Sequence, residues 1–124
     1  MKDVIFDSSF LMAIAETPTD WEDGLLGSLG GFEPVMLKAV SEELDRLSSG
    51  KGKRAKAARV AIEISKRFKP LKGGPGKADE EIISAALGSA AAVATMDREL
   101  IRALTKLRVE TVTLRSGRVA LVSR

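Results

Sequence analysis

The chain has 124 residues, of which 44% are hydrophobic and 30% charged, a balance typical of one globular domain rather than of a disordered segment. It contains no cysteine and no histidine, which excludes disulfides, thiolate nucleophiles, cysteine-based zinc sites and histidine acid–base catalysis. The formal net charge of +3 is unevenly distributed, because residues 51–77 carry ten Lys or Arg and one acid while the remainder is net acidic. Catalysis here would rely on carboxylates, Lys, Arg, hydroxyls and bound metal ions.

Short apolar runs in this sequence predict strands, and apolar residues three or four positions apart predict helices. Thr19 and Glu22 fit a capping box at the start of the second helix, and residues 73–76 predict a glycine-rich loop. Strands that alternate with helices indicate one α/β domain over residues 1–124, a three-layer α/β/α sandwich with a mostly parallel sheet. In chain order, the pattern predicts a strand at 4–6, helices at 8–16 and 19–29, a strand at 34–37, helices at 38–47 and 53–67, a strand at 68–71, a helix at 79–87, a strand at 91–95, a helix at 97–107, and strands at 109–114 and 119–122.

Four acidic residues lie at or near the carboxyl ends of these strands: Asp7, Glu43, Asp79 and Asp97. Ligands of open α/β sheets bind at the carboxyl ends of the strands. We therefore expect the four carboxylates to lie together at that edge of the sheet, which we call the rim. Carboxylates that approach one another repel, and a divalent cation relieves that repulsion. An all-oxygen set of donors suits Mg²⁺ or Mn²⁺.

Each acid also has a purely structural interpretation. Asp79 and Asp97 stand at predicted helix starts, where Asp is a favoured cap. Glu42 and Glu43 could form a solvated helix face. Asp7 directly follows a buried apolar run, so its structural role would be limited to capping the next helix.

At these residues the sequence resembles the PIN-domain ribonucleases, over nearly its whole length. The family often has Asn at the positions of Ser9 and Met96. The late Leu114-Arg115 and the short final strand resemble archaeal relatives of the rRNA-processing PIN proteins more than bacterial VapC-like toxins. The segments that carry the resemblance are Val4-Ile5-Phe6-Asp7-Ser8-Ser9-Phe10-Leu11, Val40-Ser41-Glu42-Glu43-Leu44, Ala78-Asp79-Glu80-Glu81-Ile82-Ile83 and Val93-Ala94-Thr95-Met96-Asp97-Arg98-Glu99-Leu100.

The resemblance implies a metal-dependent endoribonuclease that cleaves single-stranded RNA with a metal-activated water. By this analogy the four carboxylates are catalytic and hold one or two Mg²⁺ or Mn²⁺ ions. Ser9 and Thr95 would orient ligands or water, and Glu80 would be an outer ligand. The register of the Glu-Leu motif selects Glu43 rather than Glu42.

Contacts to RNA phosphates are expected from the basic segment, although a solvated basic helix is the alternative interpretation. Such contacts set affinity without selecting a base sequence. Trp21 and Phe32 are expected to pack in the interior rather than to stack on bases. The expected nucleic-acid-binding residues are Lys51, Lys53, Arg54, Lys56 and Arg59, with Arg98 beside the acids.

Two other functions fit the same residues: a catalytically inactive PIN-like module that binds RNA or a protein partner, and the toxin of a toxin–antitoxin pair. A homodimer, an antitoxin and a ribosome-assembly partner are the protein partners that the resemblance suggests. No run reaches the ~18 apolar residues of a membrane span, and the charged start lacks a signal-peptide core. We therefore expect a cytoplasmic protein that does not bind membranes.

Overall fold

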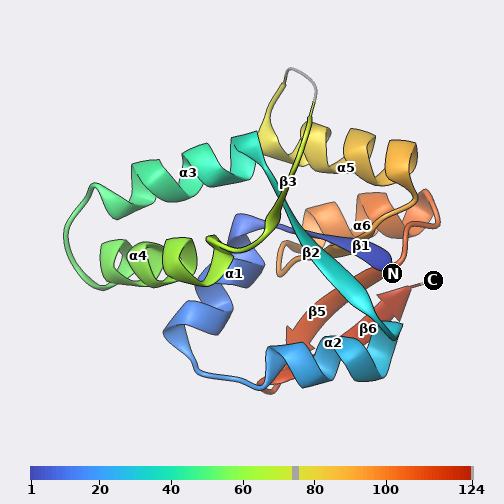
Figure 1. The fold of residues 1–124 in the computed structure, drawn as a ribbon, viewed down its shortest axis with the longest axis horizontal. Coiled ribbons are helices and arrows are strands. Elements are labelled where there is room, and N and C mark those ends of the chain that lie inside the picture. The colour runs from blue at the N-terminus through green and yellow to red at the C-terminus, as the bar shows by residue number, and fades with distance from the viewer. Residues whose placement is uncertain (74–75, 124) are drawn as a thin grey trace.

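The computed structural model describes residues 1–73 and 76–123, so Gly74 and Pro75 of the predicted glycine loop lie outside the described residues. Each strand and helix expected from the sequence is present, with ends that differ by a few residues. In chain order the elements are β1 (Lys2–Phe6), α1 (Ser8–Glu16), α2 (Trp21–Leu29), β2 (Phe32–Leu37), α3 (Lys38–Ser48), α4 (Lys53–Ser65), β3 (Lys69–Leu71), α5 (Ala78–Ser89), β4 (Ala92–Ala94), α6 (Arg98–Lys106), β5 (Thr111–Arg115) and β6 (Arg118–Ser123) (Figure 1).

The strands form one sheet in the order β3-β2-β1-β4-β5-β6. β1 lies in the middle, parallel to β2 on one side and to β4 on the other, and β6 runs antiparallel to β5. Because connections between parallel strands are right-handed, helices that lead from β1 to β2 and from β2 to β3 cover one face, and α5 and α6 cover the other. This confirms the predicted three-layer α/β/α arrangement with a mostly parallel sheet.

The core lies along β1, whose last three residues are fully buried. Phe6 ends the strand and contacts three aromatic rings, with centroid distances of 5.5 Å to Phe10, 5.5 Å to Trp21 and 4.8 Å to Phe68. Offset and edge-on contacts of this kind add to the free energy gained by burial. Packing on all sides therefore fixes the end of β1, directly before Asp7.

The helices are short and pack closely. α2 approaches β6 so tightly that a Cβ atom at Gly24 would lie 2.7 Å from Val119, which makes a side chain at this position a steric clash. In the described part of the chain, no helix combines the length and the apolar character needed to cross a membrane.

The capping box predicted at Thr19 and Glu22 is wrong. Helix α2 begins one residue later than the motif requires, with Asp20 at the N-cap and without a side-chain capping hydrogen bond. Glu22 is therefore the second helical residue, out of register for the reciprocal bond of a capping box. The Thr19 hydroxyl oxygen is buried and has no hydrogen-bond partner among the described residues.

Candidate carboxylate site

Asp7 and Thr95 lie side by side because they follow adjacent parallel strands. The register pairs Phe6 of β1 with Ala94 of β4, and the Asp7 backbone N–H donates to the Ala94 carbonyl at 2.9 Å. Asp7 is only 4% exposed. It occupies the N-cap position of α1, yet its side chain makes no capping hydrogen bond, so the structure does not support a capping role for this carboxylate.

Two hydroxyl groups hold the Asp7 carboxylate instead. The Ser9 hydroxyl donates to Oδ2 at 2.5 Å, and the Thr95 hydroxyl donates to the same oxygen at 2.8 Å. Each hydroxyl also accepts a backbone N–H, that of Met96 at 2.9 Å and that of Asp97 at 3.0 Å. Because both hydroxyl oxygens accept from the backbone, their protons are directed at Asp7, which fixes its orientation.

Burial raises the pKa of Asp7 above 3.8, its ordinary value, and the negative charge of Glu43 raises it further. The hydrogen bonds from Ser9 and Thr95 act in the opposite direction, because they stabilise the ionised carboxylate. The net effect is a buried carboxylate whose ionisation costs free energy.

Glu43 reaches the rim from α3. The Ser8 hydroxyl, at the first position of α1, donates to the Glu43 carboxylate. Glu42, by contrast, is exposed. Ser8 was not among the residues expected from the sequence, although its place between Asp7 and Ser9 put it at the strand end.

Asp79 is the second residue of α5 and does not cap the helix, since Lys77 occupies the N-cap position. Partial burial raises the pKa of Asp79, and repulsion from four acids raises it further. Sequence reasoning missed one of these acids, Glu99, whose signal was its place in the first turn of α6. In decreasing order of effect, the four are Asp7, Asp97, Glu43 and Glu99.

Asp97 caps α6, as its structural interpretation proposed. Its Oδ1 accepts the backbone N–H groups of Glu99 at 2.9 Å and Leu100 at 3.2 Å. Capping occupies one oxygen of the Asp97 carboxylate. It also fixes the orientation of that carboxylate, because a cap has a fixed geometry relative to its helix. Asp97 therefore fills a structural role and also contributes negative charge at the rim, as its repulsion of Asp79 indicates.

The two acids that follow Asp79 in α5, Glu80 and Glu81, differ in exposure. Glu80 is exposed and lies beside Gly76, whereas Glu81 is buried with 6% exposure. The Glu81 carboxylate packs against the backbone of Gly73, where a Cβ atom would come within 2.1 Å of it. Its burial depends on the missing side chain at Gly73.

The comparison with protein families decides the classification. A family model described as a PIN like domain matches residues 4–117. The chain belongs to the PIN-like domain family. No curated protein sequence matches it. The family assignment thus rests on nearly the whole chain and confirms the resemblance in its motifs.

Several solved structures are similar in fold to this PIN-like domain. The PIN domain endonuclease Utp24 is 24% identical over 98% of this chain and 92% of that chain, with a TM-score of 0.80. A domain of a functionally unknown protein from Methanocaldococcus jannaschii DSM 2661 is 19% identical over 100% of both chains, with a TM-score of 0.61. PAE2754 from Pyrobaculum aerophilum is 22% identical over 82% of this chain and 78% of that chain, with a TM-score of 0.53. At these identities the likeness establishes a shared fold, here one found in an endonuclease.

The donors at the rim of this PIN-like domain suit a divalent cation that prefers oxygen. They are carboxylate and hydroxyl oxygens, and the ion pairs in the described residues lie elsewhere, at Lys2–Glu110 and Lys66–Glu63. The acids do not form a ready-made cage, since no three of them in the described part of the chain come together closely enough to hold an ion. Mg²⁺ is commonly held by one or two carboxylates and completed by water, so the side chains fit that mode of binding.

The lysines expected to contact RNA from α4 lie away from the rim. Lys53 and Lys56 line a hollow with Glu16, which is the last residue of α1. Asp7 lies at the other end of this helix, directly before its first residue. A helix of nine residues is about 13 Å long, so these lysines lie near the end of α1 that is remote from Asp7. Arg59 donates to the backbone of the α3–α4 connection at 3.2 Å and stabilises it.

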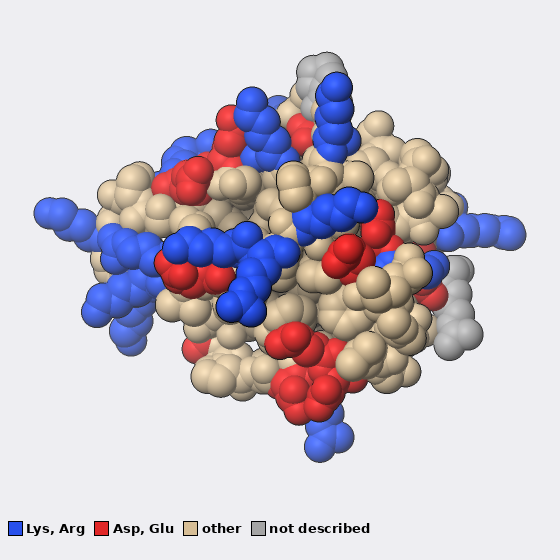
Figure 2. All heavy atoms as spheres, in the orientation of Figure 1, with Lys and Arg blue, Asp and Glu red and all other residues tan. Residues whose placement is uncertain are grey.

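Lys51 and Arg54 are also exposed on this helical hairpin, whereas Arg98 directly follows Asp97. Figure 2 shows Lys and Arg spread over α3 and α4, and Asp and Glu gathered over α2, on one face of the molecule. The predicted basic region is therefore present as an exposed surface, and only Arg98 of the six expected residues adjoins the rim in sequence.

Proposed function

We propose that this PIN-like domain is a divalent-metal-dependent endoribonuclease that cleaves single-stranded RNA at the rim formed by Asp7, Glu43, Asp79 and Asp97. Membership of the family and the fold shared with an endonuclease support the reaction class. The observation that carries the proposal is Asp7, a nearly buried carboxylate that caps nothing. Nothing in the packing of the core requires a charge at that position, and perturbed carboxylates at strand ends are typical of functional sites.

The metal would be Mg²⁺ or Mn²⁺, with Asp7 as its best-oriented ligand and Glu43, Asp79 and Asp97 completing the negative rim. Bound there, such an ion supplies charge neutralisation at the phosphate and lowers the pKa of a water molecule. The hydroxyls of Ser9 and Thr95 hold Asp7 in one orientation. Ser8 does the same for Glu43, so hydroxyl groups orient both of these acids.

The Asp7→Asn variant tests the proposal most directly. Asparagine keeps an oxygen that accepts from Ser9 and Thr95, so the network survives while the charge is lost. We expect cleavage of a 5′-labelled unstructured RNA in Mg²⁺ or Mn²⁺ to fall by more than about a hundredfold, because loss of a direct ligand should exceed the effect of losing a supporting group. Cleavage that EDTA does not abolish, or full activity in the variant, would contradict the assignment.

The rival function is a PIN-like module that binds RNA or a protein without cleaving. The absence of three clustered acids among the described residues is the observation in its favour. Titration with Mn²⁺, followed by relaxation of solvent water protons, separates the two possibilities. Binding of Mn²⁺ without cleavage of single-stranded, hairpin or tRNA-like substrates would favour the inactive module.

A further inference from the structure

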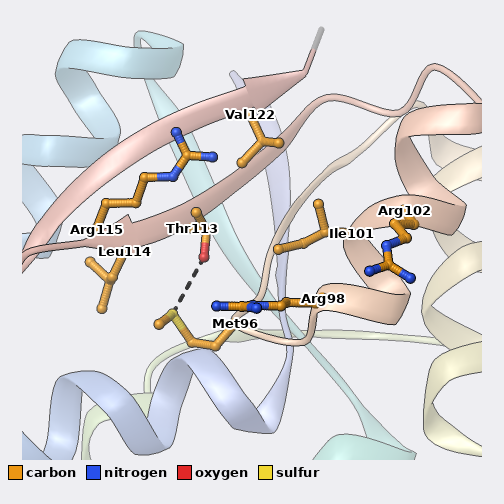
Figure 3. A pocket seen from close by; sticks show the side chains of 8 residues that line it. All are labelled: Met96, Arg98, Ile101, Arg102, Thr113, Leu114, Arg115 and Val122. Carbon is orange, nitrogen blue, oxygen red and sulfur yellow. Dashed lines mark hydrogen bonds between the residues drawn. The ribbon is translucent and has the colours of Figure 1, made fainter.

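A polar hollow adjoins the Thr95–Asp97 connection, with Met96 and Arg98 among its lining residues. It has a volume of about 550 Å³ and opens between α6 and the β5–β6 hairpin. Figure 3 shows Arg98 extending from α6 toward Met96, with Thr113 and Val122 on the strands opposite. Neither the carboxylate rim nor the basic surface on α4 includes this hollow.

Three arginines line the hollow: Arg98 and Arg102 from α6 and Arg115 from the end of β5. Residues four apart on a helix share one face, so the two helical arginines point to the same side. Within residues 1–73 and 76–123 no acidic side chain forms an ion pair with any of the three. Three guanidinium groups around one unfilled space repel one another, and an anion that enters that space relieves the repulsion.

Aliphatic side chains line the same hollow between the arginines. Ile101, Leu114 and Val122 contribute them, and Met96 forms one wall. The Thr113 hydroxyl donates to the Met96 sulfur at 3.5 Å, and because thioether sulfur is a weak acceptor, this hydroxyl is a weakly satisfied polar group beside the guanidinium groups. A small inorganic anion would leave this apolar surface uncovered, whereas an anion attached to a flat apolar ring would cover it.

The wall at Met96 connects the hollow to the carboxylate rim. The Met96 backbone N–H binds the Ser9 hydroxyl, which in turn binds Asp7, and the next residue is Asp97. The hollow and the carboxylate rim therefore share the short connection Thr95–Asp97.

We infer that this hollow binds one nucleotide of a nucleic-acid strand. Its phosphate would contact Arg102 and Arg115, and its base would lie on the aliphatic side chains of the hollow, which we call the aliphatic floor. Arginine binds phosphate through paired hydrogen bonds and stacks on bases through its planar guanidinium group. Trp21 packs against Phe6 and Phe68 and, with Phe32, lines a different hollow, so the site inferred here relies on arginine and aliphatic side chains. That the nucleotide belongs to a substrate rests on the proposed function, but the hollow as a nucleotide site does not.

The test uses the methyl group of Met96 as a reporter. The chain has only four methionines, and among the described residues Met96 is the one methionine that lines this hollow. The full chain, labelled with ¹³C at methionine methyl groups, is titrated in EDTA with adenosine 5′-monophosphate, with adenosine and with inorganic phosphate. Met96→Leu identifies the signal. We expect the monophosphate to shift it at concentrations at least about tenfold lower than the other two compounds, since it engages both the arginines and the floor.

Arg102→Gln and Arg115→Gln should each weaken binding of the monophosphate about tenfold, the scale of one hydrogen bond to a charged group. The matched control is Arg108→Gln, which removes the same charge from an exposed residue that lines a different hollow. It should leave the affinity unchanged.

Three results would overturn the inference: no shift of Met96, equal affinity for inorganic phosphate and the monophosphate, or equal affinity in all three arginine variants. Tighter binding of a hexaglutamate peptide than of the monophosphate would also overturn it and would indicate a protein partner. Because the titration contains no metal and no cleavage, its failure is separate from failure of the nuclease assay.

Discussion

The acids at the rim and the bases on α4 differ in how the fold places them. Asp7, Glu43, Asp79 and Asp97 come from four separate parts of the chain, and burial or mutual repulsion raises the pKa of two of them. The lysines and arginines of residues 51–59 come from one continuous segment and are exposed. Exposed charges add little to stability in either direction, whereas gathered acids oppose folding. The acids are therefore much stronger indicators of function than the bases.

The neighbouring residues Glu42 and Glu43 offer the largest effect within this comparison. In Glu43→Gln the amide still accepts the bond from Ser8, so the change removes charge without removing the contact. We expect metal-dependent RNA cleavage to fall at least about tenfold, the lower limit for groups that support a metal site. Glu42→Gln, on the exposed side of α3, should change the rate less than about twofold, the scale of an ordinary surface substitution.

Initial rates of RNA cleavage at saturating Mn²⁺, measured for both variants, show whether Glu43 acts as a directed ligand. Equal losses would mean that the rim depends on overall negative charge rather than on directed ligands. A larger loss in Glu42→Gln would mean that the register assigned to the Glu-Leu motif is wrong by one residue.

Thr95→Val tests whether the rim is held by its hydroxyl network. Valine has the same shape but can neither donate to Asp7 nor accept from the Asp97 backbone. We expect the free energy of unfolding to fall by about 1–3 kcal/mol, because buried polar groups lose their partners. Thr113→Val is the matched control, since that hydroxyl donates only to the weakly accepting sulfur of Met96. Urea unfolding in EDTA measures both, and equal costs would show that the network contributes nothing particular to the rim.

The fold was predictable from the sequence because its signals are local. Apolar runs gave the strands, spacing gave the helices, and the alternation of the two gave the layers. The ends of elements were less predictable, as α2 illustrates: Thr19 and Glu22 have the composition of a capping box, but the helix begins one residue too late for it. Composition does not specify a start that also depends on how Trp21 packs against Phe6.

The candidate site was predictable only in part, because contacts between distant segments leave no local pattern. The carboxylates follow strands and could be found, yet the Ser8–Glu43 bond joins residues that are 35 positions apart. The burial of Glu81 rather than Glu80 depends on the rotation of α5 against Gly73. The arginine hollow combines α6 with a hairpin that no motif marks as functional.

Asp7 also gives a prediction for stability that exposed charges do not. Its pKa is raised in the folded protein, so the native state binds more protons than the unfolded chain at intermediate pH, and stability is lost as the pH rises through that folded-state value. In EDTA at pH 7, Asp7→Asn should therefore be more stable than the wild type, and the difference should shrink toward pH 4. Millimolar Mn²⁺ should reverse the order, because an ion that binds the native state stabilises it. Thermal unfolding across these conditions measures the effect, and a variant that is less stable throughout would mean that Asp7 has a structural role.

The smallest expected effect concerns the bases on α4. Replacing Lys53, Arg54 and Lys56 with Gln should leave the fold intact and weaken binding of a single-stranded RNA to the cleavage-deficient Asp7→Asn protein. If all three contact phosphates, the slope of log affinity against log salt should decrease by about 2, from roughly 0.7 per neutralised phosphate on single strands. A control that replaces Lys66, Arg67 and Lys69 removes the same charge beyond the last turn of α4. Equal changes in both triple variants would mean that net charge alone attracts RNA. The basic surface on α4 would then be a solvated surface rather than a binding site.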